Sequence, residues 1–143
     1  MVTGLMPERR RKPMSAGWLL LAGLALAVIV FATLCPMPLR PRLFENPDLE
    51  RFAAFAALGL AAKLAVPRRH VWTILGLGVV AAVLEAGQRL VPGRDAHLWD
   101  AEVKMLGAAA GVQLGLVSLI VQRGLAATRL RPVQARRLIG RRT

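Results

Sequence analysis

The sequence predicts an all-α membrane protein, a compact bundle of four transmembrane helices with both termini on the cytoplasmic side. Three observations support this prediction. Hydrophobic residues make up 55% of the 143 residues and are concentrated in long runs of Leu, Ala and Val. The charged residues lie between these runs or at their margins. Aromatic residues make up only 5% of the chain and tyrosine is missing, whereas soluble cores rely partly on aromatic side chains.

Four apolar runs come close to the roughly 20 residues that a helix needs to cross a hydrocarbon layer about 30 Å thick. They cover about residues 16–34, 49–66, 71–90 and 101–121. A backbone in lipid must satisfy its own hydrogen bonds, and the sequence lacks the alternating short strands of a barrel, so we expect helices. We therefore predict a single membrane domain over residues 1–143, with a cationic cytoplasmic tail at 122–143.

The first two runs each have an alternative interpretation. The first follows a basic block, residues 9–12, as a signal peptide would. It is longer than the usual apolar core of 7–15 residues and no A-x-A site follows it, so we expect a retained anchor. The second run contains Lys63, which lies within a turn of Pro67 and can extend its ammonium group to the interface. A re-entrant segment is the alternative to a crossing there.

The distribution of charge predicts the orientation, since Lys and Arg accumulate in cytoplasmic loops. With four crossings, the side that carries the termini holds residues 9–12, Arg68, Arg69 and the seven arginines of the last 21 residues. Its only acidic residue is Glu8, and the other acidic residues lie on the opposite side. We therefore expect a multi-pass membrane protein with both termini on the cytoplasmic side. Trp18, Trp72 and Trp99 each fall near a helix end, where indole rings favour the interface.

The net charge of +12 does not indicate a nucleic-acid partner, because the basic residues border apolar runs instead of interleaving with polar and stacking residues. The expected partners are membrane lipids. The tail is either an interfacial helix on anionic lipid or a disordered segment that fixes the topology. The single cysteine, Cys35, excludes an internal disulfide, and neither CxxC nor HExxH occurs. We expect no cofactor and no metal site.

Small residues predict close helix packing in the last run. Gly107, Gly111 and Gly115 form a GxxxGxxxG ridge on one face. The second run is rich in alanine. These surfaces serve either internal packing, which we favour, or a homo-oligomer.

The polar residues around the end of the third run are the candidate site. Glu85 and Gln88 share one helix face, and Glu85 lies more than a turn inside the run. An ionisable residue at that depth usually faces a partner or a wet cavity. The group either forms an outward-facing site for a polar head group or is a salt-bridge network that fixes helix register. The candidate residues are Arg51, Glu85, Gln88, Arg94, Asp100 and Lys104.

Catalysis is the less favoured interpretation of this group. Glu85 with Asp100 or Asp95 offers an acid and a base, but no nucleophile accompanies them. Ser118, the only serine past the N-terminal region, lies at the far side of the last run. We therefore assign no catalytic residue.

Three ordered pieces of this sequence resemble the VanZ-like family, small bacterial membrane proteins named for a teicoplanin-resistance accessory protein. The first is the stretch DLERFAAFAALG from Asp48 to Gly59. The second is the Glu85-x-x-Gln88 face followed by Pro-Gly-Arg at 92–94, and the third is Asp100 followed by Gly107 and Gly111. Together they span nearly half the chain.

The resemblance implies a role in the cell envelope and a link to antibiotic resistance, and it leaves the reaction open. Two positions depart from the family pattern. Arg51 stands where many members have a histidine, and Lys104 stands where many have an asparagine. The hypothesis is a non-enzymatic protein that binds an envelope lipid, a lipid-linked precursor or an acylated glycopeptide. The alternatives are a membrane-embedded hydrolase or transferase, and a small transport or assembly subunit.

Overall fold

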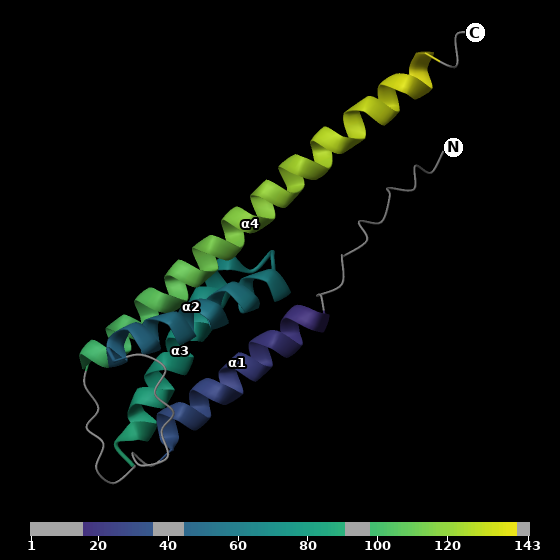
Figure 1. Cartoon of the computed structure of the whole chain (residues 1–143). Helices are drawn as coiled ribbons and strands as arrows, with labels where there is room; N and C mark the ends of the chain where they lie inside the picture. The colour runs from purple at the N-terminus through teal and green to yellow at the C-terminus, as the bar shows by residue number, and fades with distance from the viewer. Residues whose placement is uncertain (1–15, 36–44, 91–97, 140–143) are drawn as a thin grey trace, which may run out of the picture.

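The computed structural model describes residues 16–35, 45–90 and 98–139, with side chains up to residue 126. Four helices account for almost all of these residues: α1 (Ala16–Leu34), α2 (Pro47–Ala65), α3 (His70–Gln88) and α4 (Leu98–Ile139) (Figure 1). The all-helical fold that the sequence predicts is confirmed for this part of the chain. Three segments, α1, α3 and Leu98–Ala126 of α4, are long and apolar enough to cross a membrane.

Helix α2 is not among these three because it carries charge at both ends. Asp48, Glu50 and Arg51 lie in its first turns and Lys63 lies in its last. Its side chains are nonetheless the best covered of the first three helices: much of α2 is buried, whereas Ile29 is the only buried residue in α1. Because neighbouring helices cover α2, its placement within the bundle depends less on the hydropathy of its own residues.

The start of α2 lies at Pro47, two residues before the predicted boundary. Asn46 is the N-cap, and its side-chain oxygen accepts hydrogen bonds from the backbone N–H groups of Asp48 (2.9 Å) and Leu49 (3.4 Å). Pro47 occupies the first helical position, where a missing N–H costs nothing. The carboxylates of Asp48 and Glu50 lie near the positive end of the helix dipole. Polar capping, not apolarity, thus determines this boundary.

Helix α4 is much longer than the sequence predicts. The prediction ended the apolar run at about residue 121 and left the tail at 122–143 as either an interfacial helix or a disordered segment. The backbone of α4 continues as helix to Ile139. The added segment contains Ala, Leu, Arg and Gln, which favour helix whether or not lipid surrounds them, but also Gly124 and Pro132, which disfavour it. At 1.5 Å per residue the whole helix is about 60 Å long, twice the thickness of a hydrocarbon layer. Figure 1 shows it extending well past the other helices.

The glycine ridge of α4 packs against α2, and this is the most extensive contact between helices. A Cβ atom at Gly107 would overlap the backbone of Phe52, and one at Gly111 would overlap the backbone of Ala56. At Gly115 it would lie 2.9 Å from the side chain of Lys63. Because residue numbers rise together on both helices, α2 and α4 run parallel. The backbones approach this closely because no side chain intervenes.

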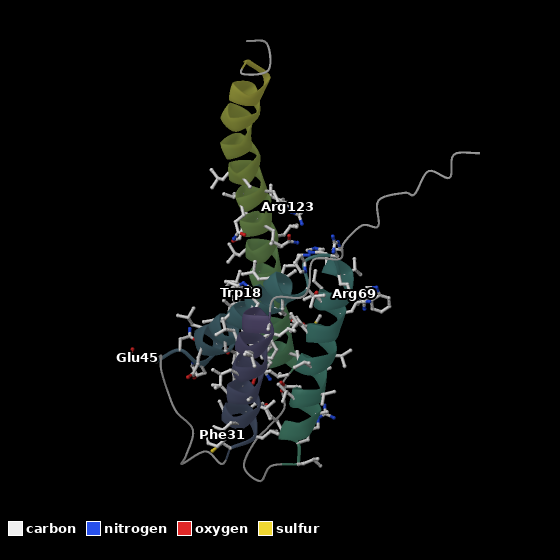
Figure 2. All side chains as sticks on the ribbon, turned by 90° about the vertical axis from the view of Figure 1, so that its right-hand side faces the viewer. Trp18, Phe31, Glu45, Arg69 and Arg123 are labelled. Atoms are coloured by element: carbon white, nitrogen blue, oxygen red, sulfur yellow. The ribbon has the colours of Figure 1, made fainter. Side chains whose placement is uncertain are left out.

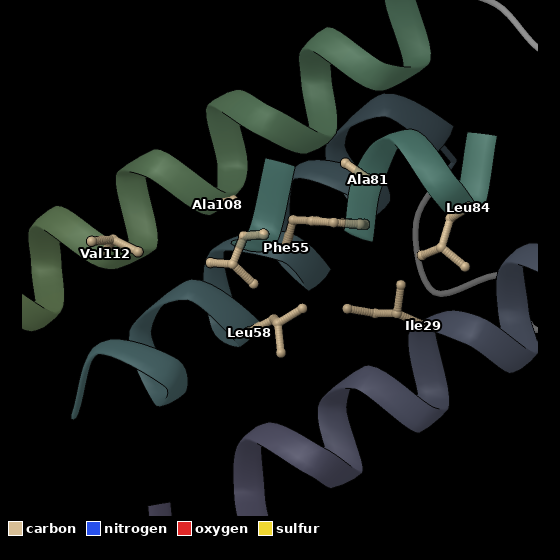
Figure 3. Close-up of a cluster of buried hydrophobic side chains, with 8 residues drawn as sticks. Ile29, Phe55, Leu58, Ala81, Leu84, Ala108 and Val112 are labelled. Atoms are coloured by element: carbon tan, nitrogen blue, oxygen red, sulfur yellow. The ribbon is translucent and has the colours of Figure 1, made fainter. Parts of the chain in front are cut away.

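A core of apolar side chains joins all four helices (Figure 3). Phe55 of α2 lies near its centre and is almost fully buried. The outer surface is also apolar: along one face of α3, for example, Val71, Leu75, Val79 and Val83 are all exposed. Exposed apolar surface on this scale is typical of a protein that contacts lipid. The remaining core residues are Ile29, Leu58, Leu77, Ala81, Leu84, Ala108 and Val112.

Candidate polar site at one end of the bundle

One end of the bundle gathers the buried polar side chains, with the exception of Lys63. Helices α1 and α3 finish at this end and α2 and α4 begin there, as shown by the close approach of Gly87 to Leu34, 3.3 Å from an added Cβ, and by the ion pairs below. We call it the polar end. The opposite end, where α2 turns into α3, is called the basic end. Phe31 and Arg69 mark the two ends in Figure 2.

The most deeply buried polar contact joins α3 to α4. The Nζ atom of Lys104 donates a hydrogen bond to Oε2 of Glu85 in a direct ion pair. Lys104 is 1% exposed and Glu85 is 8% exposed, so both charged residues are almost completely buried inside the protein. Lys104 lies in the second turn of α4 and Glu85 lies in the last turn of α3, and the pair therefore fixes the relative height of the two helices.

A second set of ion pairs joins α2 to α4. Arg51 uses both ends of its guanidinium group: Nη1 contacts Oδ1 of Asp48 and Nη2 contacts Oδ2 of Asp100, each at 2.8 Å. The side chain of Arg51 is 21% exposed, that of Asp100 is 10% exposed and that of Asp48 is 43% exposed. This arginine bridge therefore reaches from the buried interface toward the surface.

Four of the six predicted site residues thus form ion pairs, and a fifth lies beside them. Gln88 is buried one turn beyond Glu85 on the same face of α3. Arg94 lies outside the described residues. The partners also differ from the simplest expectation. Asp100 and Lys104 are four residues apart on α4, yet Asp100 contacts Arg51 and Lys104 contacts Glu85.

Two members of the cluster were not predicted from the sequence. Asp48 contacts Arg51 and also accepts a hydrogen bond from the indole Nε1 of Trp99 at 3.2 Å. The i,i+3 spacing of Asp48 and Arg51 was a usable signal for the first contact. Nothing in the sequence indicated the second, which joins residues 51 positions apart.

The described residues of this arrangement offer charged and hydrogen-bonding groups. Among the described residues, no group of three or more His, Cys, Asp or Glu side chains is placed to hold a metal ion. Glu85 lies against Lys104 in a buried ion pair. The accessible groups, Arg51 and Asp48, form a zwitterionic pair that can exchange partners with a polar ligand.

Comparison with known proteins adds no assignment to this geometry. No family model matches the chain, and no curated protein or solved structure matches it. What the chain establishes by itself is an all-helical fold in which three helices have the length and apolarity of membrane spans, as expected of a multi-pass membrane protein.

Proposed function

We propose that this chain is a VanZ-like, multi-pass protein of a bacterial inner membrane that binds the polar head group of an acylated envelope molecule at its polar end. In this proposal all four helices cross the membrane, both termini are cytoplasmic and the polar end faces outward. The ligand is an envelope lipid, a lipid-linked precursor or an acylated glycopeptide, and the resistance role follows only from the last of these.

The observation that carries the proposal is the concentration of charge inside one end of an otherwise apolar bundle. Glu85, Asp100 and Lys104 are each less than a tenth exposed, and Arg51 is close to them in the same layer. Transferring ions from water costs several kcal/mol each, and apolar replacements often stabilise a protein as well as a buried pair does. A binding role gives these charges a reason that helix packing alone does not.

In this proposal the two sets of ion pairs have different roles. The Glu85–Lys104 pair is fully covered and neutral as a unit, so it holds α3 against α4. The Asp48–Arg51–Asp100 bridge is partly open and presents a guanidinium group between two carboxylates. Arg51 is the residue that can release one carboxylate and donate to a phosphate, carboxylate or sugar oxygen of the ligand.

Lipid mass spectrometry on gently purified protein tests the proposal. The variant is Arg51→Gln, and its matched control is Arg89→Gln, which removes the same charge from an exposed position at the end of α3. We expect a co-purifying acylated molecule in the wild type and the control, and its loss from Arg51→Gln at unchanged membrane abundance. Equal lipid content in all three proteins would contradict the proposal.

Three alternatives predict different outcomes of the same purification. A hydrolase or transferase would convert an added envelope lipid, and Glu85→Gln would abolish this turnover. A transport or assembly subunit would co-purify with a larger protein in constant ratio. A purely structural network would instead show collapse of membrane abundance in Arg51→Gln, with no bound lipid in the wild type.

A further inference from the structure

The basic end of the bundle carries a second charged surface, at the opposite pole from the polar end. Arg68 and Arg69 are exposed in the turn between α2 and α3, and His70 begins α3. Arg123 of α4 lies at this same end (Figure 2). Lys63 joins them from the last turn of α2 and is close enough to Arg123 for their charges to repel each other. Five basic side chains from three helices and one turn thus lie at or just beyond this end of the bundle.

No carboxylate balances these charges within the described part of the chain. Residues 52–84 contain no Asp or Glu, and neither do residues 103–143. The described acidic residues all belong to the polar end, in the first turns of α2 and α4, in the last turn of α3 or at Glu45 just before α2. Apart from the histidine, this end carries four cations at the margin of a low-dielectric region, and these cations repel one another. A bound anion would relieve this repulsion.

The local backbone also presents donors at this end. The carbonyl of Pro67 accepts from Nζ of Lys63 at 2.8 Å, and the carbonyl of Arg69 accepts from both the backbone N–H and the hydroxyl of Thr73. The turn's carbonyl oxygens are therefore used inside the protein. The first N–H groups of α3, at His70, Val71 and Trp72, have no acceptor within the helix, and no side chain caps them.

His70 adds an independent observation at this end of the bundle. Its Nδ1 atom is buried and has no hydrogen-bond partner among the described residues. A buried polar atom without a partner is costly, so native structures rarely retain one without a reason. Protonated, Nδ1 would donate to an anion; unprotonated, it would accept from a hydroxyl group of the same ligand.

We propose that the α2–α3 turn and the start of α3 bind the phosphate group of an anionic phospholipid, through Arg68, Arg69, His70 and the free N–H groups, with Lys63 and Arg123 adding positive charge. Helix N-termini bind phosphate through their free backbone N–H groups and the helix dipole. Lipid is the favoured source of the phosphate because Trp72, 71% exposed beside the site, places it at the depth of head groups. This site is independent of ligand binding at the polar end.

The test uses the full chain purified in detergent and titrated with short-chain phosphatidylglycerol, with phosphatidylcholine as the neutral lipid. The variant is Arg68→Gln/Arg69→Gln. Its matched control is Arg136→Gln/Arg137→Gln, which removes two charges from the distal part of α4. We expect the first variant to lose about tenfold in affinity for phosphatidylglycerol and the control to lose less than twofold, since site-specific charged hydrogen bonds outweigh diffuse charge.

Each other outcome overturns the inference. Equal losses of affinity in both variants would indicate general attraction of opposite charges. No loss of affinity in either variant would show that the α2–α3 turn does not bind the lipid. Equal binding of phosphatidylcholine would show that the anion is not recognised. Displacement of phosphatidylglycerol by inorganic phosphate at the same concentration would assign the site to a free anion instead of a lipid. His70→Phe leaves both arginines in place, so it should weaken phosphatidylglycerol binding by a smaller factor than the arginine variant does. The protein yield should be unchanged.

Discussion

Glu85 and Lys104 are the two residues whose chemistry depends most on each other. Each is buried, and each neutralises the charge of the other. The sequence was sufficient to identify Glu85 as a residue needing a partner, because a carboxylate lies more than a turn inside an apolar run. It was not sufficient to choose Lys104 over Arg51 or Arg94 as that partner, since the choice depends on the rotation of α4 about its axis.

Removal of one member of the pair should be more harmful than removal of both. Lys104→Met removes the ammonium group that neutralises the buried Glu85 carboxylate and should lower the free energy of unfolding by roughly 3–5 kcal/mol. The double variant Glu85→Met/Lys104→Met should recover most of this loss, because an apolar pair of similar volume fills the site without charge. Detergent unfolding curves measure both values. A double variant as unstable as the single one would mean that the pair makes contacts beyond its own charge.

The N-cap of α2 provides a test at a single surface residue. Asn46→Ala removes the acceptor for two backbone N–H groups and should lower the free energy of unfolding by about 1 kcal/mol. Asn46→Asp keeps the acceptor and should leave the stability close to that of the wild type. The same unfolding measurement compares the two. If both variants were neutral, the start of α2 would be held by tertiary contacts and not by its cap.

At the level of the helices, the predicted boundaries agree with the structure where the apolar run and the helix end at nearly the same residue. Helix α1 has the predicted limits, and α3 differs from its prediction by one or two residues at each end. Helix α4 extends past its predicted end because the prediction used the end of the apolar run, which indicates where contact with lipid stops. The helix itself continues past that point. The glycine spacing in α4 indicated a close-packing face, but only the structure shows that α2 is the helix against it.

The α2–α4 contact predicts a large difference between two glycine substitutions. Gly111→Ala would force a methyl group into the backbone of Ala56, so the helices must separate, at a cost of roughly 1–3 kcal/mol or more. Gly76→Ala is the matched control: it lies in α3 with nothing within 4 Å of an added Cβ, and alanine favours the helix. Membrane abundance and detergent unfolding report the effect. Equal tolerance of both substitutions would exclude the close α2–α4 contact.

For the whole molecule, the separation of an acid-containing polar end from a basic end is the organising feature. The sequence predicted this separation through the positive-inside rule, because all acidic residues except Glu8 lie on one side, whereas basic residues predominate on the other. The prediction could not decide between a crossing and a re-entrant path for α2, whose charged ends lower its hydropathy. The structure gives α2 the length of 19 residues, about 28 Å of helix, enough to reach from one end of the bundle to the other.

Accessibility of the two ends of α2 tests this account most directly. Starting from Cys35→Ser, single cysteines are introduced as Glu45→Cys, just before α2, and as Arg68→Cys, just after it; both positions are exposed. We predict that a membrane-impermeant maleimide labels the first position in intact cells and the second only after lysis. Labelling of both positions from the same side would contradict a membrane-crossing α2 and, with it, the placement of the polar and basic ends on opposite faces of the membrane.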